Sequence, residues 1–261
     1  MRRVAVVTGA ARGIGAACVD ALVADGLTVI AVDRCRDEPG LSYTLGTKSE
    51  LDAVVGRHGE HAVALVGDVR SDADMALAMD TALDSFGRLD VVVAAAGVVA
   101  GGVPADLLED ADAKAELMMD VNYGGVRRAF LAAIPALLST AQGQGRLIAI
   151  SSTAGLEGLW GLADYAASKH AVLGLVRSLG PELGPRGITV NAVCPGSTDT
   201  AILKASAALY GVTPSDLIEG QPLGRLLRPE EPAAAVAYLA SKAASGTTGA
   251  AIPVDGGTTA G

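Results

Sequence analysis

Tyr165 and Lys169 are the residues whose types and spacing point most directly to chemistry. They stand four apart in segment 164–170, which is predicted to begin a helix, so their side chains share one face. A tyrosine hydroxyl ionises near pH 10, and a cation within about 4–6 Å lowers that pKa by roughly 1–3. The pair can supply a general acid and base, although taken alone it also fits an ordinary surface pair.

Ser152 favours the catalytic interpretation. It ends a predicted strand, thirteen residues before Tyr165. Ligands of open parallel sheets bind beyond the carboxyl ends of the strands, so its hydroxyl is expected on the ligand side. The three residues together predict proton transfer at a substrate oxygen.

A glycine-rich turn follows the first predicted strand and opens into a helix. Glycines let the backbone approach a pyrophosphate, and the helix N-terminus offers free N–H groups to the anion. Its place between a strand and a helix favours a dinucleotide site over a simple tight turn. The residues predicted to contact the cofactor here are Gly9, Arg12, Gly13, Ile14 and Gly15.

Asp33, at the end of the second predicted strand, bears on the choice of dinucleotide. It lies 18 residues after Gly15, where a carboxylate bonds the adenosine ribose hydroxyls and repels a 2′-phosphate. This predicts NAD rather than NADP. Arg34 and Arg12 are the opposing evidence, because two guanidinium groups can hold a phosphate. A turn residue is the plainer alternative for Asp33.

Asp68 and Val69 follow the third predicted strand and are placed to reach the adenine. The alternative is that Asp68 or Ser71 caps the next helix.

Short apolar runs alternate with helical stretches along the whole chain. Continuous apolar strands are typical of sheets covered on both faces, so the expected fold is α/β, a single-domain doubly wound parallel sheet (Rossmann fold) spanning 1–261. The predicted strands are Val4–Val7, Thr28–Val32, Ala62–Val66, Leu89–Ala95, Arg146–Ser151, Thr189–Val193 and Ala250–Val254. The predicted helices include 16–25, 71–86, 114–138 with interruptions at 124–125 and Pro135, 164–183 and 229–240.

Two stretches are predicted as irregular. Segment 35–47 is expected to be a loop after the second strand, and segment 200–227 is a candidate substrate lid. Both should lie on the ligand side of the sheet.

Composition narrows the partners. The formal charge of −9 and the scattered Lys and Arg argue against a nucleic-acid partner. The N-terminal apolar run is too short for a signal peptide or a membrane span, so a cytoplasmic protein with a small-molecule substrate is expected. The three cysteines lack metal-ligand spacing, and no metal site is expected. Trp160, between Ser152 and Tyr165, is expected either to line the pocket or to be buried in the core.

Taken together, these motifs resemble the short-chain dehydrogenase/reductase family over essentially the whole chain. Further matching pieces are Asn122 in Asp-Val-Asn-Tyr, Asn191-Ala-Val-Cys-Pro-Gly196 and Pro253-Val-Asp-Gly-Gly257. The resemblance implies that Tyr165 is the acid/base, that Lys169 holds the nicotinamide ribose and lowers the Tyr165 pKa, that Ser152 orients the substrate and that Asn122 supports a water on Lys169. It further implies cofactor contacts at Ala95, Ala96, Gly97, Pro195, Gly196, Thr198 and Thr200.

The sequence departs from the family in one place. Ala94-Ala95-Ala96-Gly97 stands where Asn-Asn-Ala-Gly is common. The amide that usually braces the neighbouring backbone is missing, so that support must come from elsewhere.

The alanine run and the long connection 35–67 also resemble the mycofactocin-associated dehydrogenases. That resemblance implies a tightly held NAD reoxidised by mycofactocin, a peptide-derived carrier. We hypothesise that the extra connection, with segment 35–47, covers the adenosine end and retards NAD release. A variable surface loop is the alternative.

The expected activity is hydride transfer between NAD and a secondary alcohol or its ketone. Reduction of a 3-oxoacyl thioester is the alternative reaction, and a catalytically silent NAD-binding sensor is the alternative of another class. The family resemblance implies a homodimer or homotetramer, and small residues on the 164–183 helix would let two helices approach: Ala166, Ala167, Ala171 and Gly174.

Overall fold

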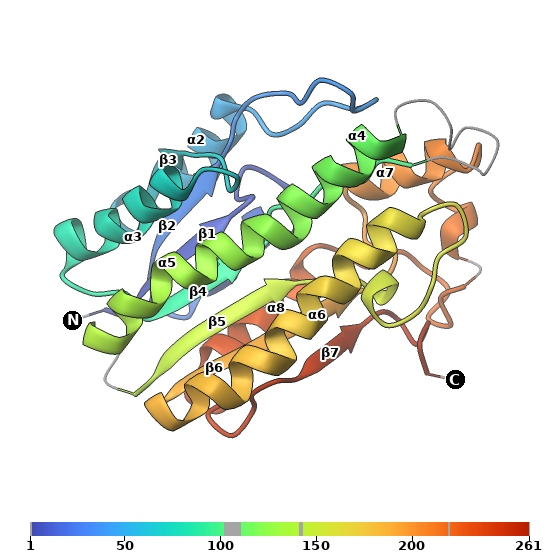
Figure 1. Ribbon diagram of the computed structural model, residues 1–261. Coiled ribbons are helices and arrows are strands. Elements are labelled where there is room, and N and C mark those ends of the chain that lie inside the picture. The colour runs from blue at the N-terminus through green and yellow to red at the C-terminus, as the bar shows by residue number, and fades with distance from the viewer. Residues whose placement is uncertain (1, 102–110, 141–142, 219, 261) are drawn as a thin grey trace.

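A computed structural model describes residues 2–101, 111–140, 143–218 and 220–260. Seven strands pair in parallel in the order β3-β2-β1-β4-β5-β6-β7 (Figure 1). Along the chain they are β1 (Val4–Thr8), β2 (Thr28–Asp33), β3 (Ala62–Val66), β4 (Val91–Ala94), β5 (Gly145–Ile150), β6 (Ile188–Pro195) and β7 (Ala251–Val254). The predicted doubly wound sheet is confirmed.

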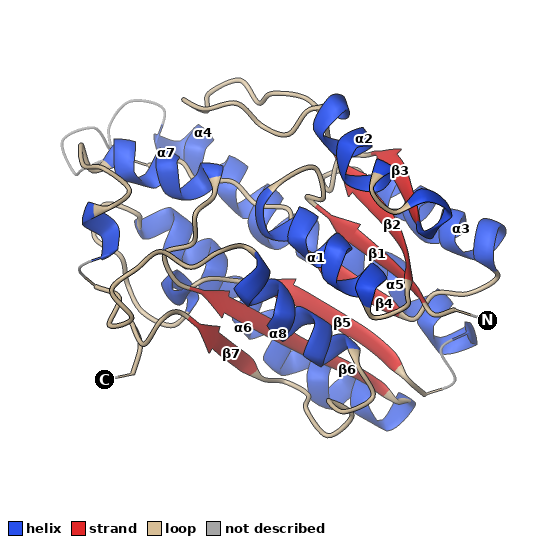
Figure 2. Cartoon of the chain, turned by 180° about the vertical axis from the view of Figure 1, so that it is seen from behind, coloured by secondary structure: helices blue, strands red, loops and turns tan. Residues whose placement is uncertain are grey.

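Helices cover both faces of the sheet, as the opposite views of Figures 1 and 2 show. One face carries α1 (Gly13–Ala24), α2 (Lys48–Gly56) and α8 (Glu230–Ala240). The other carries α3 (Asp72–Phe86), α4 (Ala111–Met118), α5 (Gly125–Thr140) and α6 (Ala163–Leu183), while α7 (Ala201–Leu209) lies beyond the carboxyl ends of the strands.

Successive residues of a strand serve two different cores. Val6 of β1 belongs to the apolar cluster that contains Phe130 of α5, and the next residue, Val7, belongs to the cluster that contains Leu22 of α1. Both strand faces are therefore buried, which explains why the strands are continuous apolar runs rather than alternating ones.

The interruptions predicted within 114–138 are not breaks. A π-helical turn, Met119–Gly124, joins α4 directly to α5, and Pro135 lies inside α5 at an exposed position. Gly125 permits a close approach between elements, because a Cβ there would lie 2.6 Å from Cγ2 of Val69. The glycines thus allow helix packing, and the wide turn carries Asn122 into the interior.

The strand order reverses between β1 and β4, which leaves a crevice beyond their carboxyl ends. Segment 35–47 contains no helix or strand and lies at this edge, as predicted. Segment 200–227 contains α7, and its two ends meet where Thr198 pairs with Leu227. Residue 219 lies outside the described residues.

Among the helices in the described ranges, none is both long and apolar enough to cross a bilayer.

Candidate active site

One cleft of about 530 Å³ follows the carboxyl edge of the sheet. All the residues predicted to contact a cofactor line it, and so does Ser152. Asn122 lies behind its wall, fully buried. The structure thus brings the glycine turn and the Tyr165/Lys169 pair into one site.

The glycine turn fits a pyrophosphate. Gly9 has φ +67°, and a Cβ on Gly15 would lie 2.0 Å from the Gly9 carbonyl oxygen, so neither position accepts a side chain. The N-cap residue of α1, Arg12, forms no capping hydrogen bond with its side chain. The N–H groups of the first helical turn therefore lack a side-chain cap at the edge of the cleft, where they can bind an anion.

Thr8 braces the alanine run after β4. Its Oγ1 accepts hydrogen bonds from the N–H groups of Ala95 (3.2 Å) and Ala96 (3.3 Å). Slightly further on, the hydroxyl of Tyr43 accepts a hydrogen bond from the N–H of Val99 (3.0 Å). These two side chains supply support that the missing amide would otherwise provide.

Asn122 ties the loop after β4 to α6. Its Oδ1 accepts from the N–H of Val98 (2.8 Å), and its Nδ2 donates to the Val98 carbonyl (3.0 Å) and to Oγ of Ser168 (3.0 Å). Ser168 in turn donates to the carbonyl of Tyr165 (2.7 Å). All three groups are in the interior, so Asn122 fixes the backbone on both sides of the cleft.

Lys169 and Tyr165 are buried together, and burial governs their ionisation. Nζ of Lys169 donates to the carbonyl of Ile150 (3.1 Å) and lies 5.7 Å from the centroid of the Tyr165 ring. Burial raises the pKa of Tyr165 to about 12, with the Ser152 hydroxyl acting in the opposite direction. Burial also lowers the pKa of Lys169 to about 8. The Tyr165 pKa therefore moves opposite to the prediction, because desolvation disfavours the charged form of each residue.

Ser152 and Thr200 both use their hydroxyl oxygens within the chain. Oγ of Ser152 accepts from the N–H of Ala154 (3.1 Å), which leaves its proton for a ligand in the cleft. Oγ1 of Thr200 caps α7 by accepting from the N–H of Leu203 (3.3 Å) and donates to the Thr198 carbonyl (3.2 Å). Thr200 lines the cleft as predicted, but its hydroxyl already has partners.

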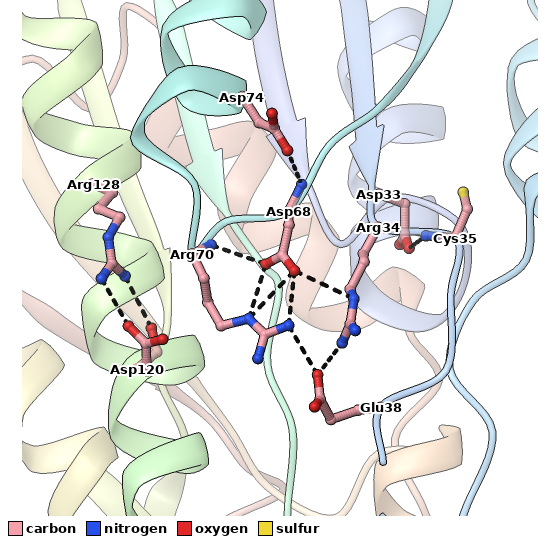
Figure 3. A network of polar contacts seen from close by, with 9 residues as sticks. All are labelled: Asp33, Arg34, Cys35, Glu38, Asp68, Arg70, Asp74, Asp120 and Arg128. Atoms are coloured by element: carbon pink, nitrogen blue, oxygen red, sulfur yellow. Dashed lines mark hydrogen bonds and ion pairs between the residues drawn. The ribbon is translucent and has the colours of Figure 1, made fainter.

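The predicted adenosine end of the cleft is a network of charged side chains (Figure 3). Asp33 accepts from the N–H groups of Ala11 (3.0 Å) and Cys35 (3.1 Å), which fixes its carboxylate at the end of β2. Arg34, offered above as part of a phosphate site, forms ion pairs with Glu38 and with Asp68 (3.3 Å). Arg12 does not join it, since its guanidinium donates to the carbonyl of Thr44.

Asp68 and Ser71 have separate roles. Ser71 caps α3 by accepting from the N–H of Asp74 (3.2 Å), whereas the carboxylate of Asp68 binds the backbone N–H and the guanidinium of Arg70. Burial alone would raise the pKa of Asp68, but the hydrogen bonds from Arg70 outweigh it and lower that pKa. Of the two capping alternatives, Ser71 is the cap.

Sequence reasoning missed several residues that line the cleft: Glu38, Tyr43, Leu45, Gly46 and Arg70. The alternation Leu41-Ser-Tyr-Thr-Leu45 inside a polar loop was the available signal, because apolar residues in a loop need something to pack on. Nothing local marks the ion pair of Glu38 with Arg70, which follows β3.

Trp160 is not buried in the core. Its side chain is 67% exposed and stacks on Tyr210, with ring centroids 6.2 Å apart. Tyr210 lines the cleft, so Trp160 does not line the cleft itself but packs against a residue that does.

Comparison with known proteins agrees with this geometry. The family model described as Enoyl-(Acyl carrier protein) reductase matches residues 9–259. The cis-4-hydroxycyclohexanecarboxylate dehydrogenase of Sinomonas cyclohexanicum is 38% identical over 259 residues, covering 99% of this chain and 97% of its own. A Streptomyces virginiae protein named for ketoacyl reduction in the monensin polyketide synthase is 38% identical over 268 residues, covering 98% and 96%.

A solved structure extends the likeness to three dimensions. Carveol dehydrogenase from Mycobacterium avium in complex with NAD has a TM-score of 0.90 and 29% sequence identity, covering 99% of this chain and 98% of that one. The chain therefore belongs to the short-chain dehydrogenase/reductase family.

Proposed function

We propose that the protein is an NAD-dependent oxidoreductase that moves a hydride between the cofactor and a secondary alcohol or its ketone. The observation that carries the proposal is the convergence of the glycine turn, Ser152, Tyr165 and Lys169 on one cleft. The names of two relatives specify alcohol dehydrogenases, and one of them has NAD bound.

In this proposal the chain positions the substrate oxygen and moves one proton. The glycine turn and Lys169 would hold the cofactor, which when bound would accept the hydride as NAD during oxidation and donate it as NADH during reduction. Ser152 donates a hydrogen bond to the substrate oxygen, and Tyr165 takes the alcohol proton during oxidation or gives one to the carbonyl oxygen during reduction. Asn122 acts as a positioning residue, through its bonds to Val98 and Ser168.

The lining of the cleft favours an uncharged alcohol. Its arginines come from the glycine turn and the ends of β2 and β3, whereas segments 156–162 and 197–220 contribute a mixture of apolar side chains and Ser or Thr hydroxyls. In the described part of those segments the charged groups of the lining are Glu157 and Asp216, both carboxylates. One relative is named for a substrate with its hydroxyl on a cyclohexane ring. That substrate also carries a carboxylate, so the carboxylates of this lining favour a ring alcohol without the acid group.

The 3-oxoacyl thioester alternative is less well supported. A carrier-protein or coenzyme A substrate brings phosphate groups, which require cations at the cleft mouth. The described substrate side presents carboxylates instead. The family description and the ketoacyl relative keep this alternative worth testing.

We further propose that segment 35–47 retards NAD release, as in a mycofactocin-coupled enzyme. The contacts that anchor the segment include Glu38 to Arg34 and Arg70, Thr44 to Arg12, and Tyr43 to Val99. Tyr43, Leu45 and Gly46 line the same cleft as Asp33, so the segment lies against the predicted nucleotide site rather than in solvent.

One experiment separates these possibilities. Protein purified without added cofactor is denatured, the released nucleotide is identified, and oxidation of a cyclic alcohol is followed with free NAD and separately with an artificial electron acceptor. Retained NAD with turnover only through the acceptor supports mycofactocin coupling, whereas reduction of free NAD identifies an exchanging dehydrogenase. Absence of turnover in both assays supports the silent sensor.

We also propose a homodimer or homotetramer built on α5 and α6. Leu131 and Leu138 are exposed on α5, and Ala167 and Gly174 are exposed on α6. Ala166, expected to help, is instead buried in the core. Light scattering that returns a mass near 26 kDa would contradict an oligomer.

A further inference from the structure

We infer that Glu38 is a second determinant of nucleotide choice, because it neutralises two arginines that would otherwise bind the 2′-phosphate of NADP. The inference rests on the proposed dinucleotide site. It concerns a residue in segment 35–47 and does not depend on whether that segment slows NAD release.

Arg34 and Arg70 bring two guanidinium groups to the end of the cleft where Asp33 stands. Both contact the same two carboxylates. Arg34 pairs with Glu38 and with Asp68 at 3.3 Å, and Arg70 pairs with Glu38 at 2.9 Å and with Asp68 at 2.8 Å. Figure 3 shows the four side chains closing on one another beside Asp33.

The four side chains are largely withdrawn from water, with exposed fractions between 14% and 24%. Their charges cancel, and Asp33 adds one further negative charge. An incoming 2′-phosphate would therefore meet net repulsion although two arginines stand within reach, because each arginine is already paired with two carboxylates. Screening by solvent is limited for side chains at this level of burial.

Among the three acids at this end of the cleft, Glu38 is the one whose replacement changes the net charge with the least effect on the backbone. Asp68 also accepts from the N–H of Arg70 (2.9 Å), and Asp33 accepts from two backbone N–H groups, so both hold the chain in shape. Within the described residues, the polar contacts of the Glu38 carboxylate are with the two guanidinium groups. Its backbone carbonyl accepts from the N–H of Leu41 (3.3 Å), which the substitution keeps. Neutralising Glu38 leaves two arginines against one carboxylate in the network.

The structure therefore predicts a particular order of effects. Replacing Asp33 alone removes a repulsive charge but leaves both arginines paired, so NADP binding should improve little. Glu38→Gln should raise the preference for a 2′-phosphate about tenfold, which corresponds to about 1.4 kcal/mol. The double variant Asp33→Asn with Glu38→Gln should show the largest preference for a 2′-phosphate, because both changes remove negative charge from the same end of the cleft.

The test uses two readouts that do not require turnover. NAD and NADP released on denaturation of purified protein are quantified for each variant, and nucleotide-free protein is titrated calorimetrically with ADP and with 2′,5′-ADP. The expected result is NAD in the unsubstituted protein and a rising NADP share in Glu38→Gln and the double variant. Affinity for ADP should stay unchanged while affinity for 2′,5′-ADP rises.

Two controls isolate the pairing. Asp37→Asn removes a neighbouring negative charge from the same loop while keeping the oxygen that accepts from Leu45, and it should leave the preference unchanged. Adding Arg70→Gln to Glu38→Gln should cancel the gain. An equal change in affinity for ADP and for 2′,5′-ADP, or the same change in Asp37→Asn, would overturn the role of Glu38 but not the nucleotide site. Failure of the unsubstituted protein to bind ADP would overturn the nucleotide site, and this inference with it.

Discussion

The two ends of the cleft treat charge in opposite ways. At the adenosine end, two arginines and two acids pair with one another, so each charge is compensated on site. At the proposed catalytic floor, formed by Ser152, Tyr165 and Lys169 with Asn122 behind it, the described contacts of Lys169 include a carbonyl and no carboxylate. Paired charges influence which ligand binds through the charge that is left over after pairing. A buried charge without a partner, such as that of Lys169, instead has a shifted pKa.

Tyr165→Phe should give the largest effect and tests whether the floor performs proton transfer. Loss of the acid/base should lower kcat by about 10²–10⁴-fold. Tyr238→Phe is a matched control, because Tyr238 is exposed on α8 and should leave kcat unchanged. A Tyr165→Phe protein with full activity would end the proposed mechanism.

Asn122→Ala tests how much the hydrogen bonds of this amide contribute to the stability and activity of the proposed catalytic floor. The substitution leaves the N–H and carbonyl of Val98 without their partner in the interior, and each such group costs about 1–3 kcal/mol. The free energy of unfolding should fall by that order, measured by chemical denaturation, with kcat reduced as well. Unchanged stability would mean that water replaces the amide.

The pH dependence of kcat/KM should reflect the ionisation of both Tyr165 and Lys169. The Tyr165 pKa of about 12 means that the phenolate is scarce near neutral pH, so kcat/KM for alcohol oxidation should rise by about tenfold per pH unit. The rise should weaken above pH 8, because Lys169, with a pKa of about 8, then loses the charge that favours the phenolate. Ketone reduction uses the phenol and should stay flat over the same range. An oxidation rate that falls from pH 7 to 8 would contradict this assignment.

Tyr43→Phe should give the smallest effect. It tests whether the hydrogen bond between segment 35–47 and the loop after β4 slows the dissociation of nucleotide. The variant loses one hydrogen bond, from the N–H of Val99, worth about 1 kcal/mol and hence about fivefold in an equilibrium. Dissociation of bound nucleotide should be faster by that factor in a displacement assay. Thr44→Ser changes the same segment without removing the Thr44 carbonyl that Arg12 contacts, and it should leave the dissociation rate unchanged.

The sequence was sufficient for the sheet, because apolar runs buried on both faces have an unambiguous pattern. It misjudged the interruptions at Gly124, Gly125 and Pro135, since the helical path continues through a π-helical turn that ends at Gly124 and Pro135 lies inside α5. All the predicted cofactor residues do line the cleft. Most of them end or follow a strand, and the strands share one carboxyl edge, whereas Tyr165 and Lys169 come from α6.

The pairing of side chains could not be predicted in the same way. Glu38 and Arg70 are 32 positions apart, and only the folded sheet brings β2 and β3 together with segment 35–47. The direction of the Tyr165 pKa was predicted from one neighbouring cation, whereas the burial that reverses it is a property of the whole fold.

The low pKa of Lys169 has a practical consequence. At pH 8 about half of the molecules carry this side chain as a free amine, and that amine lies in the wall of the cleft. A neutral amine is a nucleophile, so a small aldehyde followed by a mild reductant should alkylate Lys169 near neutral pH. A bound ligand should shield it, which would turn covalent labelling into a direct measure of how much of the cleft is filled.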